Sequence, residues 1–189
     1  MSVSLGNISI KDMYYGSTKI GEAYLGSTKV YGSGQPIPQG YTYFLWYVDY
    51  YDNNLFHQQD FALYDSKDST TKITGFTSIA GQTSSNPGSE NYPNGFDGNS
   101  NTKWYSSDTY PNWCIFTKDQ SINPVGLSYM TANDQSLVSN RSPRAFKLCG
   151  SNVYTTDPND SNWVTIYETS NNPIFVDVSN NKVWVDLYF

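Results

Sequence analysis

The sequence predicts an all-β fold, a β-sandwich preceded by a small N-terminal β-hairpin or meander. Aromatic residues make up 16% of the 189 residues, and charged residues only 15%. Short runs of β-branched and aromatic residues recur along the chain, and turns rich in Gly, Pro, Asn and Asp separate them. No long segment keeps the periodicity of a helix. Many short strands at regular intervals are typical of two packed β layers.

The N-terminal part contains a repeat. Residues 14–20 (YYGSTKI) recur as residues 24–30 (YLGSTKV), and each copy predicts a strand, a Gly-containing turn and a second strand. A hairpin of this size is marginally stable in water. We therefore expect residues 1–32 to be a docking or anchor segment that packs against another surface. The alternative is an extra edge hairpin of the main domain.

Residues 33–40 (SGQPIPQG) have the composition of a linker, flexible at the Gly/Ser end and stiffer at the prolines. Residues 41–189 then form the predicted sandwich. Its expected strands are Tyr41–Tyr51, Phe61–Tyr64, Ile115–Phe116, Val125–Met130, Ala145–Leu148, Trp163–Tyr167, Ile174–Val178 and Val183–Phe189.

The net charge of −6 makes nucleic acid a poor partner, because binding phosphates requires clustered Lys and Arg. Residues 1–39 hold three lysines against two acidic residues, so the acidic excess lies in the predicted sandwich. No run of apolar residues is long enough to span a membrane. Residues 1–10 lack the basic and apolar regions of a signal peptide, so we expect none.

Two cysteines, Cys114 and Cys149, lie in strand-like runs. We expect two buried free thiols, since free cysteine behaves as a small apolar residue in a core. A disulfide between them is the alternative.

Three segments from residue 41 onward resemble the coagulation factor five/eight C-terminal domain, also called discoidin-like or galactose-binding-like. They are residues 95–104 (GFDGNSNTKW), 142–152 (SPRAFKLCGSN) and 162–166 (NWVTI). Bacterial relatives of this domain are the family thirty-two carbohydrate-binding modules. The resemblance implies a discoidin-like jelly-roll sandwich that binds ligands through its loops.

The order of segments departs from the family in one respect. Segments that resemble the aromatic strand and the acid-led strand, which usually come last, stand first here, as residues 41–47 (YTYFLWY) and 59–64 (QDFALY). That order resembles versions in phage and bacterial surface proteins. The N-terminal Tyr-x-Gly repeat also looks like short segments at the start of phage virion proteins.

The turn from Asp97 to Thr102 is the candidate metal site. Calcium takes six to eight oxygen ligands, and this turn offers a carboxylate, a hydroxyl and carbonyls. By resemblance, Asp60 takes the place of the family's acidic ligand, and carbonyls of Gln59 and Asn94 complete the shell. The chain departs from the family here, with the shorter Asp in place of Glu. The alternative is a metal-free Asx-turn in which Asp97 caps its own loop.

A glycan is expected at loops on one end of the sandwich, since sugar sites combine an aromatic ring with fixed polar groups. Asn133 and Arg141 are the sharper candidates, because the family places polar contacts on the loop after the strand that matches Val125–Met130. Trp104 and Trp163 are expected in the core. Ordinary polar loop decoration is the alternative for the whole candidate set, which is Tyr92, Tyr105, Tyr110, Asn133, Asp134 and Arg141.

Catalysis finds little support in the sequence. His57 is the one histidine, so a two-histidine metal site is excluded and a serine triad would depend on it alone. We interpret it as a surface residue. A glycoside hydrolase site built on a pair of carboxylates is not excluded by the sequence.

These observations favour a non-enzymatic phage virion protein, such as a head fibre, capsid decoration or tail adsorption component. Residues 1–32 would attach it to other virion proteins, and the sandwich would bind glycan on a bacterial surface or in mucus. We expect a homo-oligomer, a trimer by analogy with fibre proteins. One alternative is a carbohydrate-binding module of an extracellular bacterial protein. Another is a purely structural virion subunit.

Overall fold

The computed structural model describes the backbone of residues 13–15, 18–20, 22–25 and 28–32, and residues 40–51, 55–67, 70–82, 89–107, 111–134, 141–170 and 180–189. The chain divides into two compact units, residues 1–38 and 39–189. Of the predicted linker, Gly40 alone lies within the described residues, and the predicted strand Ile174–Val178 lies outside them.

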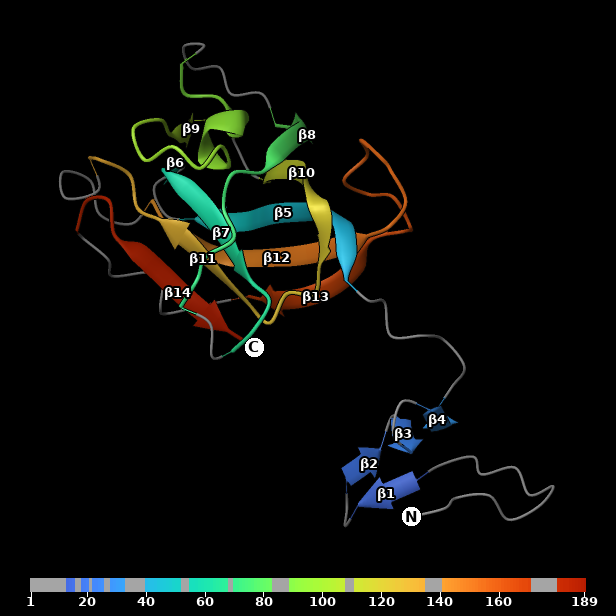
Figure 1. The fold of residues 1–189 in the computed structure, drawn as a ribbon. Helices are drawn as coiled ribbons and strands as arrows, with labels where there is room; N and C mark the ends of the chain where they lie inside the picture. The colour runs from blue at the N-terminus through green and yellow to red at the C-terminus, as the bar shows by residue number, and fades with distance from the viewer. Residues whose placement is uncertain are drawn as a thin grey trace. The chain divides into compact units, whose positions relative to one another are not determined.

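The first unit contains two antiparallel strand pairs (Figure 1). Strand β1 (Met13–Tyr15) pairs with β2 (Thr18–Ile20), and β3 (Glu22–Leu25) pairs with β4 (Thr28–Gly32). Each copy of the repeat thus supplies a strand on either side of its Gly-Ser dipeptide, as the pattern predicts.

A five-stranded antiparallel sheet dominates the second unit (Figure 1). Its order is β13 (Val164–Thr169), β12 (Pro143–Ser151), β5 (Tyr41–Tyr51), β10 (Asn112–Ile122) and β8 (Thr77–Gly81). The central strand β5 agrees with its predicted bounds, whereas β8 has no counterpart among the predicted strands. All the pairings in this sheet are antiparallel.

A three-stranded sheet and one short pair complete the second unit. The sheet has the order β14 (Trp184–Tyr188), β11 (Gly126–Met130) and β7 (Asp60–Tyr64), and β6 (Phe56–Gln58) pairs with β9 (Trp104–Ser106). The described residues include one 3₁₀ turn, η2 (Tyr92–Gly95), and no α-helix. In that part of the chain no helix has the length and apolar character needed to cross a membrane. The all-β prediction is confirmed.

The core lies where the two sheets face each other. Alternate residues of β5, namely Phe44, Trp46 and Val48, point into it, because successive side chains of a strand face opposite sides. Phe61 of β7 contacts Trp46 at a ring-centroid distance of 5.0 Å and Phe116 of β10 at 5.5 Å. Such aromatic pairs add about 0.5–1.5 kcal/mol to the free energy of burial. Aromatic contacts therefore join the two layers.

Both cysteines are buried and free, as expected. Cys114 on β10 is the cross-strand partner of Trp46 on β5, and Cys149 on β12 is the cross-strand partner of Leu45 on β5. Strand β5 therefore lies between the two strands that carry the cysteines. Neighbouring strands lie about 4.8 Å apart, so the intervening strand places the two cysteines about 10 Å apart. That separation is beyond the Cα distance of a disulfide.

Candidate functional site

The turn from Asp97 to Thr102 is closed by its own hydrogen bonds. The Asp97 carboxylate accepts from the backbone N–H of Asn99 at 2.8 Å, which forms an Asx-turn. The Thr102 hydroxyl lies 2.9 Å from the other Asp97 oxygen and 2.8 Å from the Asn99 carbonyl. The structure thus contains the Asx-turn in which Asp97 caps its own loop.

Gly98 gives the turn its shape. Its φ of 75° lies in the left-handed region that favours glycine. A Cβ atom at this position would lie only 3.0 Å from the Cα of Gly75, which also has a positive φ of 68°. Two glycine backbones pass each other here, so a side chain at Gly98 would require the neighbouring backbone to shift.

Asp60 connects strand β7 to the turn. Its side chain is buried, and its Oδ1 atom accepts from the backbone N–H groups of Phe61 at 2.8 Å and Gly98 at 3.3 Å. Burial raises the pKa of Asp60 to about 6. The two backbone hydrogen bonds oppose this shift, and the neighbouring charge of Asp97 adds to it. The two carboxylates therefore repel each other.

The side chain of Gln59 stabilises the turn through hydrogen bonds to its backbone. Its side-chain amide nitrogen donates to the carbonyl oxygens of Ser100 at 3.0 Å and Thr102 at 2.5 Å. Its own side-chain carbonyl oxygen is buried and has no hydrogen-bond partner among the described residues. Leaving a buried acceptor unsatisfied costs about 1–3 kcal/mol. Gln59 thus keeps one unused acceptor.

Among the predicted metal ligands, Asp60, Asp97, Thr102 and Gln59 are linked to the turn by hydrogen bonds. The side-chain nitrogen of Asn94, the fifth predicted ligand, donates to the Ser89 carbonyl at 2.7 Å. No group of three His, Cys, Asp or Glu side chains that could hold a metal occurs among the described residues. Two mutually repelling carboxylates, a hydroxyl and carbonyls nevertheless have the chemistry of a calcium site.

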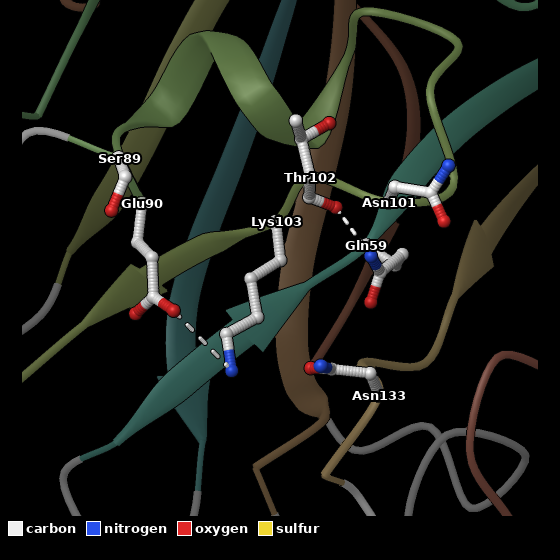
Figure 2. A pocket seen from close by; sticks show the side chains of 7 residues that line it. All are labelled: Gln59, Ser89, Glu90, Asn101, Thr102, Lys103 and Asn133. Atoms are coloured by element: carbon white, nitrogen blue, oxygen red, sulfur yellow. Dashed lines mark hydrogen bonds and ion pairs between the residues drawn. The ribbon is translucent and has the colours of Figure 1, made fainter.

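A cavity of about 280 Å³ lies beside the turn. Figure 2 shows side chains of Gln59, Lys103, Glu90 and Asn133 around a shared space. Asn133 comes from the loop after β11, and it is exposed. The lining residues are Gln59, Ser89, Glu90, Asn101, Thr102, Lys103 and Asn133.

Lys103 is the charged centre of this pocket. Its ammonium group lies 3.1 Å from an Asp134 oxygen and 3.6 Å from a Glu90 oxygen, and 13% of its side chain is exposed. Burial acts to raise the pKa of Asp134, but the Lys103 hydrogen bond and the nearby His57 outweigh it and lower that pKa. The two carboxylates offset the charge of Lys103, so these three groups carry no positive excess.

His57 is fully buried, so the prediction of a surface histidine is wrong. Strand β6 pairs with β9 and places His57 opposite Tyr105, and the imidazole Nδ1 lies 3.3 Å from Asp134. An Arg141 nitrogen lies 3.5 Å from the same imidazole atom. The burial of His57 was missed because this short strand pairing was not predicted.

Most of the predicted ligand-binding residues lie near this pocket. Asp134 and Arg141 join the Lys103 and His57 cluster, and the Arg141 guanidinium lies 5.6 Å from the centroid of the Tyr105 ring. Tyr92 instead packs against the core, where a Cβ on Gly81 would meet its ring. Tyr110 lies outside the described residues.

The predicted core tryptophans differ in their surroundings. Trp104 is fully buried in the main core, as expected. Trp163 is only partly buried, and it packs against a second, smaller cluster formed by Leu45, Ile115 and Cys149.

Sequence reasoning did not select Lys103, Glu90 or His57 as site residues. Lys103 directly precedes the motif tryptophan, Trp104, and this position next to the Asp97–Thr102 turn was the available signal. Glu90 belongs to no recognised motif, and tertiary structure brings it close to Lys103. Comparison of the chain with models of protein families, with curated proteins and with solved structures finds no match.

Proposed function

We propose that this chain is a non-catalytic binding protein whose sandwich holds one unit of a glycan in the pocket beside Gln59 and Lys103. The observation that carries the proposal is a polar cavity with Gln59, Glu90, Lys103 and Asn133 around one space. Gln59 also has a buried side-chain carbonyl oxygen without a partner among the described residues, and a ligand hydroxyl could donate to it once the side chain turns toward the cavity. The discoidin-like resemblance of the sequence supports the same ligand class.

The polar groups of the pocket suit hydroxyl groups. A sugar hydroxyl both donates and accepts, and the pocket offers acceptors on Gln59 and Glu90 beside donors on Lys103 and Asn133. Because Glu90 and Asp134 offset the charge of Lys103, the pocket favours a neutral sugar over an acidic one. A volume of about 280 Å³ is close to the lower end of the roughly 300–1,000 Å³ range of ligand pockets, which fits a single sugar unit.

The protonation states of the carboxyl groups support a binding role. A glycosidase acid needs a raised pKa, but the pKa of Asp134 is lowered. The pKa of Asp60 is raised to about 6, yet this carboxyl is buried under the turn and does not line the pocket. Neither group is suited to protonate a ligand in this cavity.

The N-terminal unit would attach the protein to a larger assembly. Two-stranded sheets of three to five residues per strand are marginally stable alone, so they need a supporting surface. The resemblance of the Tyr-x-Gly repeat to phage virion proteins favours a virion surface, as a head fibre, decoration or tail component. Self-association into a homo-oligomer would provide further support.

Glycan arrays followed by calorimetry test the binding proposal. Asn133→Ala removes an exposed donor from the pocket, and we expect it to weaken glycan binding about tenfold. Gln120→Ala, which changes an exposed amide on β10, is the matched control and should bind like the original protein. Absence of glycan binding at millimolar concentrations would contradict the proposal. So would unchanged binding in both Asn133→Ala and Lys103→Met.

Deletion of residues 1–32 tests the anchor. We expect the truncated chain to keep its β circular-dichroism spectrum and its glycan binding, but to be lost from particles. Normal incorporation into particles would remove the anchor role. If the full chain enters particles but binds no glycan, the purely structural alternative replaces the binding function.

A further inference from the structure

The outer face of the five-stranded sheet carries a second apolar cluster. Thr165, Cys149, Leu45 and Ile115 lie on four neighbouring strands in one cross-strand row. Leu45 and Ile115 are fully buried although they point away from the main core, and Cys149 is 2% exposed. Partly buried side chains, including Tyr47, Trp113 and Trp163, pack against them.

A second cavity, of about 270 Å³, lies over this row. Its floor is the part of the row formed by Thr165, Cys149 and Leu45. Lys147, two residues before Cys149 on β12, also lines it. The segment from Pro158 to Trp163 supplies the remaining side. The cavity shares no lining residue with the pocket around Lys103. Its lining residues are Leu45, Lys147, Cys149, Pro158, Asn159, Asp160, Trp163 and Thr165.

Hydrogen bonds fix the polar residues of this segment. The Asp160 carboxylate accepts from both the backbone and the side-chain nitrogen of Asn162, each at 2.8 Å. These bonds lower the pKa of Asp160, so it is ionised near neutral pH. The backbone N–H of Asn159 donates to the Asp157 carboxylate, and the indole N–H of Trp163 donates to the Asp157 backbone carbonyl, at 2.9 Å each. The segment is therefore organised before any ligand arrives.

We propose that this cavity is a second carbohydrate-binding site, which takes one neutral pyranose unit. The partly buried Trp163 offers apolar surface to the C–H groups of the sugar, while Asn159, Asp160 and Lys147 meet its hydroxyls. Lys147 and Asp160 carry opposite charges, so the lining favours neither an anionic nor a cationic ligand.

The remaining aromatic residues of this face would extend the site. Tyr47 lies beside Lys147 in the sheet, with the ammonium group 4.4 Å from its ring centroid, and Trp113 is the cross-strand partner of Tyr47. Both rings are partly buried and pack at the edge of the cluster. The next unit of a chain held in the cavity would meet these rings. Two separate sites on one sandwich would strengthen binding to a polysaccharide through multivalency.

The test is an NMR titration of the full chain with methyl pyranosides of glucose, galactose, mannose and N-acetylglucosamine. We expect at least one of them to shift the indole N–H resonance of Trp163 at millimolar concentration. Asn159→Ala and Lys147→Met should each weaken this response severalfold. Asn133→Ala makes the same kind of substitution in the pocket around Lys103, and it should leave the Trp163 response unchanged. Asn159 is exposed, so its replacement should not affect folding.

The outcomes separate this site from the proposed function. If no sugar shifts the Trp163 resonance while the Lys103 pocket still binds glycan, the second site is wrong and the proposed function stands. If Asn133→Ala abolishes the Trp163 response, a single site explains the binding and the second site is again wrong. A response that only Asn159→Ala and Lys147→Met weaken supports the second site, whatever happens at the first pocket.

Discussion

The backbone N–H of Gly98 donates to the carboxylate of Asp60 at 3.3 Å, across 38 positions of sequence. This bond joins the start of strand β7 to the turn that borders the proposed glycan pocket. Because Asp60 is buried and charged, the bond makes the position of the turn dependent on the protonation of one carboxyl group.

Asp60→Asn should change the pH dependence of stability. The pKa of Asp60 rises from 3.8 to about 6 on folding, so the unfolded state loses its proton first as the pH increases. The original protein therefore loses stability between about pH 4 and pH 6, and asparagine, which keeps the acceptor, avoids this loss. We expect the variant to gain up to about 2–3 kcal/mol relative to the original protein between pH 4 and pH 7. Urea unfolding at both pH values measures this, and a difference that does not change with pH would contradict it.

Calcium should counteract the same repulsion if the turn binds it. An ion between Asp60 and Asp97 favours the ionised carboxylates, so calcium should raise the melting temperature by several degrees and a chelator should reverse the effect. Asp60→Asn should remove most of the response. A melting temperature that is the same in calcium and in chelator would leave the Asx-turn as the whole role of Asp97.

Gly98→Ala should destabilise the sandwich by about 1–3 kcal/mol. Alanine disfavours a φ of 75°, and its Cβ would lie 3.0 Å from Gly75. Ser100→Ala changes an exposed side chain in the same turn and should stay within about 0.5 kcal/mol. Equal midpoints for the two variants in chemical unfolding would exclude the close glycine contact.

Asp134→Asn should weaken the folded state only when the carboxyl group is ionised. The pKa of Asp134 is lowered on folding, so its contribution is present above its unfolded pKa and disappears as the pH falls. With 31% of the side chain exposed, we expect a loss of about 0.5–1 kcal/mol at pH 7. Unfolding at pH 3 and pH 7 measures the difference, and an equal loss at both would show a steric cause.

Neither cysteine should react in the native protein. Burial raises the pKa of both Cys114 and Cys149, which leaves little thiolate. A thiol reagent such as dithiobisnitrobenzoate should label both in denaturant without prior reduction. Labelling of the folded chain at the rate of a free thiol, or a need for reductant in denaturant, would contradict this arrangement.

The sequence predicted strands best where the aromatic and β-branched runs were long. Tyr41–Tyr51 was predicted with both ends correct, because the run is dense in aromatic and β-branched residues and its alternate residues Phe44, Trp46 and Val48 face the core. Strands β6 and β9 were missed because each has three residues, and the pairing of Phe56 with Ser106 is stabilised by tertiary contacts rather than by local preference.

The candidate site was predicted in part. The motif around Asp97 located the turn, and the loop after β11 located Asn133 and Asp134. Lys103 and Glu90 were missed because their ion pair links segments whose sequence shows only ordinary charged residues. His57 was assigned to the surface because neither its pairing with Tyr105 nor its contacts with Asp134 and Arg141 could be predicted from local sequence.

The central position of β5 also constrains the order in which the second unit can form during synthesis. Val48 pairs with Asn112, and Phe44 pairs with Gly150, so β5, the first strand of this unit to be synthesised, waits for both of its neighbours. Contacts of such long sequence separation fold slowly, and an unpaired apolar strand is prone to aggregation meanwhile. Expression at low temperature or with chaperones should therefore increase the soluble yield of this protein.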